Sequence, residues 1–483
     1  MVSLFRILDA HQGALNWNNA KDGQNTPIGM SVMQLALYEK YDLRLPRYTS
    51  YPTAPHFHGG IDGQVFASWL GDLDPDQPLS LYLHVPYCEE MCWFCGCNTK
   101  ITKHYKPVGT YVAALLAELD STLSKLNPGQ RFSVSHIHFG GGSPTILRAD
   151  DLRAIMAKIR DKVDILPDAE IAIEMDPRTA SNDLMDAMVE CGFNRASIGI
   201  QDFNIDVQKA VNRVQSFDLV RDVIAGLRHR GIRGINVDLM YGLPNQTVKS
   251  IRETVDQTVE LCPDRLSVFG YAHVPWMKKH QNLIPTETLP DTQERWAQYE
   301  EIQNRLAYHD YVAIGLDHFA HPADPMARAL LDGALHRNFQ GYTTDRAEAL
   351  IGFGPSAISS LPQGYAQNDP ALARWQRAVE DGKCAIEKGI AVSNEDRLRR
   401  DIINELMCNL SVDVAEICAE HGTSADRFIP ELDRIKAMTA DDIVKVNGTH
   451  IELTETGRPL VRAVCAAFDT YLNHAHGRHS QAV

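Results

Sequence analysis

The sequence predicts an α/β protein centred on a partial (βα)6 barrel, with an N-terminal segment before it and a mainly helical C-terminal domain after it. Two observations support this prediction. Between Pro78 and Pro275, short apolar stretches alternate with amphipathic helical stretches. From about Ala371 onwards the pattern becomes helical. Because eight strand–helix units close a barrel, six predict an open barrel with its functional site at the carboxyl ends of the strands.

Length and composition indicate an enzyme with one large domain and one or two smaller ones. The chain has 483 residues, of which 44% are hydrophobic and 23% are charged. Its apolar runs fall short of the roughly 18 residues that a membrane span needs, and its N-terminus lacks the layout of a signal peptide. We therefore expect a cytoplasmic protein with reduced thiols. A formal net charge of −15 argues against a nucleic-acid partner, so an anionic small molecule would need a local basic patch.

Residues 1–77 are predicted to form the N-terminal segment. Residues 1–30 are rich in Asn, Gly and Gln, which predicts loose order, and Met30 could be the natural start of the chain. Residues 31–42 have the pattern of a helix. Residues 45–57 are interrupted by Pro and predict an extended segment.

The barrel and an extension that would complete its substrate site are predicted over residues 78–370. Asp, Ser or Asn stands near the start of several helical stretches, and Gly near the end of several, as expected of helix caps. The predicted strands are residues 81–87, 136–140, 170–176, 195–201, 234–241 and 265–272. Helical patterns follow at residues 108–126, 149–163, 181–193 and 216–231.

Three cysteines directly after the first predicted strand are the strongest chemical signal. Cys88, Cys92 and Cys95 are spaced C-x3-C-x2-C on one loop, and soft thiolate ligands suit iron and sulfur. Three thiolates would leave one iron of a 4Fe–4S cluster without a protein ligand. A structural zinc site would need a second cysteine pair, and the remaining cysteines outside this stretch are scattered singly. Cys97 is not needed as a ligand by this count, and we expect it to have a packing or substrate-side role.

Further polar and glycine-rich positions follow the later strands. Gly140, Gly141 and Gly142 would let the backbone approach a ligand closely, although such a run is also typical of a flexible turn. Glu174 ends the third strand, where it could also simply pair with a neighbouring Arg. Asp238 lies within an apolar run, and a buried carboxylate must be paired or hydrogen-bonded, which makes Asp238 a functional candidate.

The cysteine spacing after a strand resembles the radical S-adenosylmethionine (SAM) enzymes. The extension to Cys97 resembles one family among them, the oxygen-independent coproporphyrinogen III oxidases, also called coproporphyrinogen dehydrogenases. Residues 46–53, PRYTSYPT, are similar to the N-terminal segment that lies over the active site in that family. The resemblance begins near Met33 and covers most of the chain. Mild departures are Phe139 where an indole often stands, Gly270 where Asn is common, and Ser143 where Thr is usual.

The resemblance implies a 4Fe–4S cluster on Cys88, Cys92 and Cys95, together with two SAM molecules. It places the first SAM near Tyr82, Gly141, Glu174 and Ile358. It places the second SAM near Phe94, Gly142, Ser143, Gln201, Arg213, Asp238 and Ala272.

Beyond the barrel, residues 314–322 and 335–344 are dense in polar and aromatic side chains. These side chains are His318, His336, Arg337, Asn338, Gln340 and Tyr342. They could be loop residues that hydrogen-bond one another. The substrate that the resemblance implies carries four propionates, and a charge pair at about 4 Å gains roughly 4 kcal/mol at an effective dielectric near 20 before desolvation. Arg337 is therefore the candidate anchor for the substrate.

The C-terminal domain is predicted over residues 371–483, with helices at 374–392, 394–410 and 424–438. A hairpin with an Asn-Gly turn is predicted at residues 442–457, followed by a closing helix at 457–475, which together suggest a winged-helix arrangement. His474, His476 and His479 could bind a metal or form a solvated tail.

The function implied by the resemblance is oxidative decarboxylation of two propionates of coproporphyrinogen III to vinyl groups, giving protoporphyrinogen IX in haem biosynthesis. A 5′-deoxyadenosyl radical from SAM would start each decarboxylation. We expect an electron donor such as flavodoxin or ferredoxin, and a monomer. Related haem chaperones share the cluster motif, but they typically have an aromatic residue at the position of Cys97 and lack the HRNFQGYTT pattern of residues 336–344. A radical SAM enzyme acting on another tetrapyrrole, for example by opening haem, also remains possible.

Overall fold

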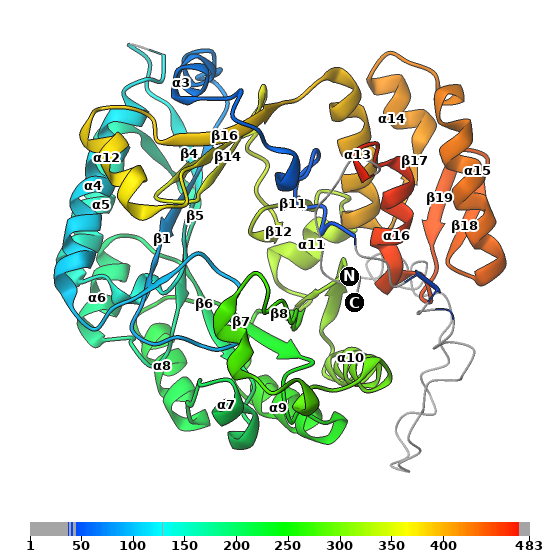
Figure 1. The fold of residues 1–483 in the computed structure, drawn as a ribbon, viewed down its shortest axis with the longest axis horizontal. Coiled ribbons are helices and arrows are strands. Elements are labelled where there is room, and N and C mark those ends of the chain that lie inside the picture. The colour runs from blue at the N-terminus through cyan, green and yellow to red at the C-terminus, as the bar shows by residue number, and fades with distance from the viewer. Residues whose placement is uncertain (1–36, 38–39, 42–44, 128, 473–483) are drawn as a thin grey trace, which may run out of the picture.

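A computed structural model describes residues 37, 40, 41, 45–127 and 129–472 of the chain. It shows a large α/β body beside a smaller, mainly helical C-terminal unit (Figure 1). The N-terminal stretch predicted to be loosely ordered, the His474, His476 and His479 tail and most of the helix expected at residues 31–42 lie outside the described residues.

The six strands predicted for the barrel are all present and lie side by side. They are β1 (Leu79–Val85), β4 (Ser133–Gly141), β5 (Asp164–Met175), β6 (Arg195–Gln201), β7 (Gly234–Tyr241) and β8 (Arg265–Gly270). Each pairs in parallel with the next, and Ile137 of β4, for example, lies opposite Leu81 and Ile171. The predicted partial barrel is thus confirmed. Six of the seven residues of β1 are buried, as expected of a strand covered on both faces.

The sheet extends beyond the six strands at both edges, to twelve strands in total. Next to β1 lies β13 (Ala349–Phe353), which runs parallel to it. The antiparallel strands β14 (Ile358–Leu361), β15 (Gly364–Asn368) and β16 (Ile386–Ala391) continue from β13. Beyond β8 lie β10 (His318–Ala320) and β9 (Val312–Ile314), both antiparallel to their neighbours. The alternation of strands and helices in the sequence did not predict these additional edge strands.

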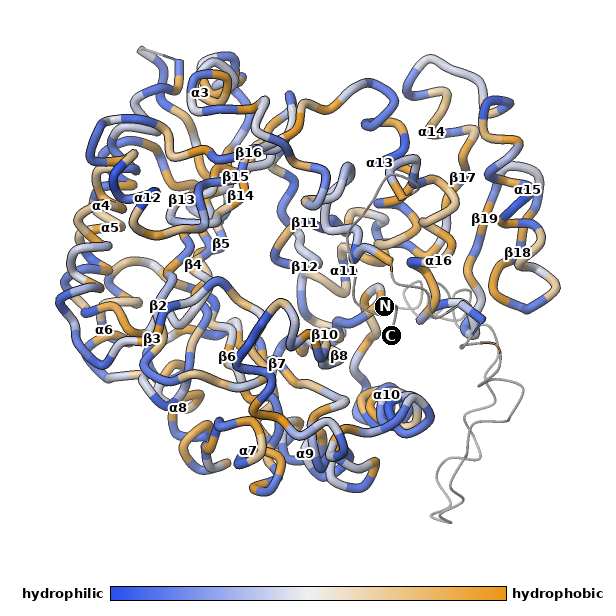
Figure 2. The backbone as a smooth tube through the Cα atoms, viewed as in Figure 1, coloured by the Kyte–Doolittle hydropathy of each residue, from blue (hydrophilic) through white to orange (hydrophobic). Residues whose placement is uncertain are grey.

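Helices cover the outer face of the sheet, and in Figure 2 most of them carry alternating hydrophobic and hydrophilic stretches. They are α4 (Tyr105–Leu123), α5 (Ala149–Lys162), α6 (Asn182–Glu190), α7 (Ile205–Ala210), α8 (Phe217–His229), α9 (Val248–Glu260) and α10 (Thr292–Tyr308). The hydroxyls of Ser181 and Ser216 accept backbone N–H groups at the starts of α6 and α8, and Thr247 with Ser250 forms a capping box on α9.

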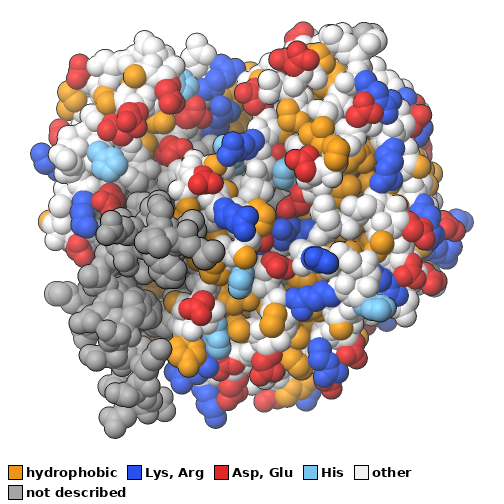
Figure 3. Space-filling model, turned by 180° about the vertical axis from the view of Figure 1, so that it is seen from behind, with side chains coloured by type: hydrophobic (Ala, Val, Ile, Leu, Met, Phe, Trp, Pro, Cys, Tyr) orange, Lys and Arg blue, Asp and Glu red, His pale blue; other side chains and the backbone are white. Residues whose placement is uncertain are grey.

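Shorter elements connect these layers. They are α3 (Gly63–Gly71), β2 (Tyr87–Cys88), β3 (Lys100–Ile101), α11 (Pro325–Leu331), β11 (His336–Asn338), β12 (Gly341–Thr343) and α12 (Leu372–Glu380). None of the described helices is both long and apolar enough to cross a membrane. On the face opposite to Figure 1, acidic and basic side chains are mixed, with several Lys and Arg side chains near the centre (Figure 3).

The C-terminal unit contains α13 (Asn394–Asn409), α14 (Val414–Glu420), α15 (Ile429–Ala437) and α16 (Val461–Cys465). A three-stranded antiparallel sheet accompanies them, with β17 (Ser411–Asp413), β18 (Val444–Asn447) and β19 (His450–Leu453). The hairpin expected at residues 442–457 is formed by β18 and β19, with Gly448 at a positive φ of 63° in its Asn-Gly turn.

Three helices expected in the C-terminal part were wrong in extent. Residues 374–392 form the end of α12 and then β16, because Gly382 ends the helix at a φ of 72°. Residues 424–438 form a 3-10 turn and then α15, which starts anew at Ile429 with Pro430 in its first turn, where Pro is favoured. The described part of residues 457–475 contains only short helical pieces around α16.

The N-terminal segment, residues 45–57, runs between the two units and contacts both (Figure 1). It is only partly extended as predicted, because it bends at residues 49–52 and forms a 3-10 turn at Ala54–His56. On one side, the Tyr48 hydroxyl donates to Asp469 Oδ2 at 3.1 Å, and Tyr51 Oη lies 3.1 Å from Thr470 Oγ1. On the other side, the Tyr365 hydroxyl of β15 donates to the Tyr51 carbonyl. The segment therefore links the sheet to the C-terminal end of the described chain.

Candidate functional site

The cysteine loop lies at the carboxyl end of β1, where the sequence predicted the site. The loop begins at β2, which pairs in parallel with β3 and so joins the two ends of the loop. Cys88, Cys92 and Cys95 carry free thiols and line one cavity of about 190 Å³. Other residues around the same cavity are Phe94, Cys97, Gly141, Gly142, Ser143, Glu174, Gln201, Arg213 and Asp238. The fold thus brings together residues from five strand ends.

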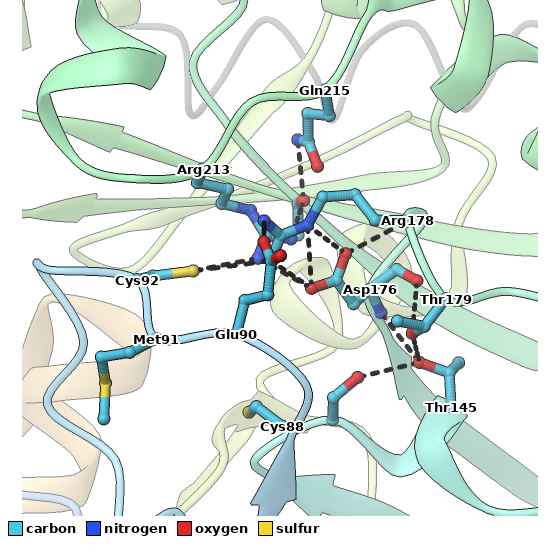
Figure 4. Close-up of polar contacts among 12 residues, drawn as sticks. Cys88, Glu90, Met91, Cys92, Thr145, Asp176, Arg178, Thr179, Arg213 and Gln215 are labelled. Carbon is cyan, nitrogen blue, oxygen red and sulfur yellow. Dashed lines mark hydrogen bonds and ion pairs between the residues drawn. The ribbon is translucent and has the colours of Figure 1, made fainter. Parts of the chain in front are cut away.

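Two guanidinium groups lie beside Cys92 (Figure 4). Arg213 Nη1 donates to Cys92 Sγ at 3.5 Å, and Arg178 Nη2 donates to it at 3.7 Å. Both arginines also contact Asp176 Oδ2, at 3.1 and 2.7 Å. Burial raises the pKa of Asp176, but hydrogen bonds from Arg178 and the charge of Arg213 outweigh it and hold this pKa below its usual value. Two cationic side chains, both paired with Asp176, thus lie within contact distance of the Cys92 sulfur.

Cys95 and Cys97 interact within the loop. The Cys97 backbone N–H donates to Cys95 Sγ at 3.4 Å. Hydrogen bonding by Cys97 lowers the pKa of the Cys95 thiol to about 6, and the charges of His280 and Lys278 act in the same direction. Burial raises the pKa of Cys88 to about 11. Among the described residues, no three His, Cys, Asp or Glu side chains converge on a single metal ion; the thiols instead surround a cavity. Sulfur ligands around a cavity with cations nearby fit a 4Fe–4S cluster.

A second loop holds the cysteine loop from the outside. The buried Gln281 donates to the carbonyls of Phe94 at 3.0 Å and Ala272 at 3.3 Å. His280 Nε2 lies 2.8 Å from the Cys95 carbonyl, and Lys278 Nζ donates to the Cys97 carbonyl at 3.0 Å. These contacts fix the backbone on which the thiols stand.

The glycine stretch approaches the cysteine loop so closely that side chains are excluded. A Cβ on Gly142 would lie 2.6 Å from the Tyr87 carbonyl oxygen. Gly141 has a φ of 115° and donates its N–H to Glu174 Oε2 at 3.0 Å. The Ser143 hydroxyl is buried and lies 2.8 Å from Thr145 Oγ1. The glycines therefore permit the contact between β4 and the cysteine loop.

Two acidic side chains, Glu174 and Asp238, face the cavity, and their pKa values are shifted in opposite directions. Burial raises the pKa of Glu174, but hydrogen bonding to His138, at 3.3 Å, and the Gly141 N–H outweigh it and hold this pKa below its usual value. Burial, aided by the charge of Glu174, raises the pKa of Asp238 to about 7. Gln201 beside them has a φ of 69°, a strained conformation for a residue that is not glycine.

Three of the expected SAM residues do not line the cysteine cavity. Tyr82 lines an adjoining interior cavity that shares Glu174 and Asp238, and its hydroxyl lies 3.1 Å from His84 Nδ1. Ala272 lines a larger cavity, together with Arg337. Ile358 lies on β14 and packs against the apolar cluster around Phe57 and Tyr365.

The sequence reasoning missed Asp176, Arg178 and Gln281. Asp176 and Arg178 follow directly after β5, so their position at a strand end was a usable signal. Gln281 lies in a loop beyond β8 and carries no sequence signal for its contact with the cysteine loop.

The partial barrel and the three thiols at its strand ends define a radical SAM enzyme, and residues 82–258 match the Radical SAM superfamily. The protein accordingly uses a 4Fe–4S cluster and SAM. Residues 392–460 match the HemN C-terminal domain. The chain belongs to the family of oxygen-independent coproporphyrinogen III oxidases, as the following relatives show.

The oxygen-independent coproporphyrinogen III oxidase of Bradyrhizobium diazoefficiens is 48% identical over 440 residues, which cover 91% of this chain and 97% of that protein. The protein of the same name from Escherichia coli is 41% identical over 448 residues, covering 92% and 97%. The solved structure of coproporphyrinogen III oxidase (HemN) from Escherichia coli, described as a radical SAM enzyme, superposes with a TM-score of 0.84 at 39% identity. That match covers 89% of this chain and 100% of the solved one.

Proposed function

We propose that this protein oxidatively decarboxylates two propionate side chains of coproporphyrinogen III to vinyl groups, giving protoporphyrinogen IX in haem biosynthesis. The observation that carries the proposal is the convergence of Cys88, Cys92 and Cys95 on one cavity with the glycine stretch and Glu174, in a chain of this family. Cys88, Cys92 and Cys95 would hold the cluster.

When bound, the cluster and SAM supply a 5′-deoxyadenosyl radical that removes a hydrogen atom from the β-carbon of a propionate. Loss of CO2 and one electron then leaves the vinyl group, with the electron passing to a one-electron acceptor. We assign the first SAM to Tyr82, Gly141, Glu174 and Ile358. We assign a second SAM to Phe94, Gly142, Ser143, Gln201, Arg213, Asp238 and Ala272.

The protein's own groups position and shield these ligands. Glu174 remains ionised and suits a cationic ligand group, whereas Asp238, with its pKa of about 7, can accept or donate a hydrogen bond near neutral pH. Gly141 and Gly142 bring the backbone close to the ligand, and Gln281 holds the carbonyl of Phe94. These contacts would hold the polar groups of the site in fixed positions, which a site that must keep water away from a radical requires.

The electron donor and the assembly state are part of the proposal. We propose that a small electron-transfer protein such as flavodoxin or ferredoxin reduces the cluster, that each turnover uses two SAM molecules, and that the protein acts as a monomer in the cytoplasm. Size-exclusion chromatography with light scattering of the holoenzyme tests whether the protein is a monomer.

An anaerobic turnover experiment tests the reaction. The cluster is reconstituted and reduced, SAM and coproporphyrinogen III are added, and products are followed by mass spectrometry. We expect loss of two CO2 units matched by two molecules of 5′-deoxyadenosine. SAM cleavage without decarboxylation would contradict the proposed substrate, and haem would then be the next compound to test. Haem binding without SAM cleavage would instead indicate a chaperone.

A further inference from the structure

A cavity of about 450 Å³, larger than the cysteine cavity, collects arginines from four separate parts of the chain. Arg47 comes from the N-terminal segment, Arg295 from α10, Arg337 from β11 and Arg462 from α16. We call it the arginine cavity. Its wall is complete only when the sheet, the N-terminal segment and the C-terminal unit are packed together.

The arginine cavity is positively charged although the whole chain is acidic, with a net charge of −15. Among the described lining residues, the acidic ones are Asp291 and Asp317, so arginines outnumber acidic side chains there. Burial lowers the pKa of His273, which therefore adds no charge at neutral pH. Burial and the positive charge of Arg47 lower the pKa of Arg462 to about 10. The guanidinium groups thus repel one another, and an anion would relieve the repulsion.

Arg337 is a buried cation whose hydrogen-bonding capacity is only partly used. Its side chain is 3% exposed, and its Nη1 lies 3.8 Å from Asp317 Oδ1, too far for a good hydrogen bond. Its guanidinium lies 4.3 Å from the ring centre of Tyr342. The buried Nε and Nη1 of Arg337 have no hydrogen-bond acceptor among the described residues. A carboxylate in the cavity would supply one.

The rest of the lining suits an apolar ring system. Tyr241, Phe269 and Leu316 line the arginine cavity between the charged groups. Phe269 also lines the interior cavity that contains Glu174 and Asp238, which in turn line the cysteine cavity. A macrocyclic ligand with carboxylates in the arginine cavity could therefore extend towards the site where SAM is proposed to bind.

The chemistry of decarboxylation decides which carboxylates belong with the arginines. The reacting carboxylate leaves as neutral CO2, so an ion pair with it is stronger before the reaction than in the transition state. Such a pair would raise the barrier. An ion pair with a carboxylate that does not react is equally strong in both states and only increases binding.

Resting on the proposed function, we infer that the arginine cavity binds the two propionates that remain on the product, and not the two that are lost. Arginines outnumber acidic side chains among the described residues of the lining, and the buried Nε and Nη1 of Arg337 lack an acceptor there, which favours bound carboxylates. The reacting propionates would then point away from the arginines, towards Phe269, which lines both the arginine cavity and the interior cavity.

Binding measurements with substrate and product test this inference. The holoenzyme with an oxidised cluster is titrated anaerobically with coproporphyrinogen III or protoporphyrinogen IX, so that no turnover occurs. We expect Arg337→Gln, Arg462→Gln and Arg47→Gln each to weaken both ligands by the same factor, roughly tenfold or more for a charged hydrogen bond. In turnover, KM should rise by a similar factor while kcat stays within about twofold.

Controls separate this inference from folding effects. Arg221→Gln removes an exposed arginine that, within the described part of the chain, pairs with Asp218 and Asp222 of its own helix, and it should change neither ligand's affinity. SAM affinity and the visible spectrum of the cluster should be unchanged in every variant. Because Arg47 is exposed, Arg47→Gln retains the fold even if a buried substitution does not.

Three results would overturn the inference. They are weakened binding of coproporphyrinogen III alone, a lower kcat at unchanged KM, and unchanged binding of both ligands. These results differ from failure of the proposed function, which would be absence of coproporphyrinogen III turnover by the unsubstituted enzyme.

Discussion

The close contact between Gly142 and Tyr87 sets the position of the loop that carries the three cysteines. A Cβ at residue 142 would lie 2.6 Å from the Tyr87 carbonyl oxygen and 2.9 Å from its nitrogen, so the strands must separate. We expect Gly142→Ala to destabilise the protein by about 1–3 kcal/mol, as overpacking does, and to lower the iron bound after anaerobic reconstitution.

Gly96 provides the matched control for this prediction. It lies between Cys95 and Cys97, and a Cβ there would meet nothing within 4 Å. Gly96→Ala should therefore bind iron like the unsubstituted protein. Full iron content in Gly142→Ala would show that this backbone contact does not position the cysteines.

The charge of Arg213 next to Cys92 should affect the reduction potential of the bound cluster. Its Nη1 lies 3.5 Å from the sulfur, and removing a positive charge makes the addition of an electron less favourable. We expect Arg213→Gln to make the midpoint potential more negative by roughly 40–130 mV, since a charge several ångströms away is worth roughly 1–3 kcal/mol at an effective dielectric near 20 for a one-electron reduction.

A redox titration followed by electron paramagnetic resonance measures this change. Arg213→Lys keeps the charge and should recover most of the potential, whereas a merely structural role would leave both variants alike. A potential unchanged in Arg213→Gln would contradict the electrostatic role.

The position of a single residue could be predicted where it follows from the spacing of residues along the chain. Cys88, Cys92 and Cys95 lie on one loop after a strand, so their convergence could be predicted from the sequence. The roles of Asp176 and Arg178 depend on Cys92, which is distant in the chain, and no local pattern shows that contact.

Among the secondary-structure elements, helix α4 is attached to the outer strands of the sheet through one buried carboxyl group. Glu118 accepts hydrogen bonds from Gly354 N at 2.7 Å, Asn368 Nδ2 at 2.8 Å and Trp375 Nε1 at 3.0 Å. Burial nevertheless raises its pKa to about 7, because the hydrogen bonds only partly offset desolvation. The charged form is therefore disfavoured in the folded protein.

This shift predicts how stability depends on pH. Since the folded protein holds the proton of Glu118 more tightly than the unfolded chain, this contribution is fully present below about pH 4.5 and is lost as pH rises through about 7. The loss is on the order of 3 kcal/mol. Glu118→Gln cannot titrate, so its free energy of unfolding should rise relative to the unsubstituted protein between pH 5 and pH 8. Urea unfolding at several pH values measures the difference, and a pH-independent difference would contradict the assignment.

Elements were predictable where hydrophobic period and caps agree. Strands β6 and β7 begin and end at the predicted residues. The helix expected at 374–392 failed because its second half, β16, is stabilised as a strand by pairing with β15 rather than by any local preference. Long-range pairing thus outweighed the amphipathic pattern.

At the scale of the whole molecule, distant segments meet in ways that one sequence does not reveal. Strand β13 lies parallel to β1 although most of the barrel separates them in the chain. The arginine cavity depends on the same kind of contact, because Arg47 and Arg462 come from opposite ends of the described chain. The sequence motif around Arg337 allowed this arginine to be proposed as a substrate anchor. No comparable motif pointed to Arg47, Arg295 or Arg462.

The N-terminal segment gives the last prediction, because it joins both units and carries Arg47. Tyr48 is 1% exposed and donates its hydroxyl to Asp469 at 3.1 Å. Tyr48→Phe removes this donor and should destabilise the protein by about 1.5–3 kcal/mol, the range for a hydrogen bond to a charged group. The segment should then open more often, so that trypsin cleaves faster after Arg47 under native conditions.

Opening of the N-terminal segment should weaken the binding of the substrate and leave the binding of SAM unchanged. With Arg47 held less firmly, we expect a higher KM for coproporphyrinogen III at unchanged SAM affinity, because the arginine cavity loses one wall while the cysteine cavity keeps all of its own. Tyr308→Phe, at an exposed tyrosine of α10, is the control and should change neither cleavage nor KM. If Tyr48→Phe weakened the binding of SAM and of substrate equally, the N-terminal segment would act on the whole barrel. The inference that the arginine cavity and the cysteine cavity bind their ligands separately would then be wrong.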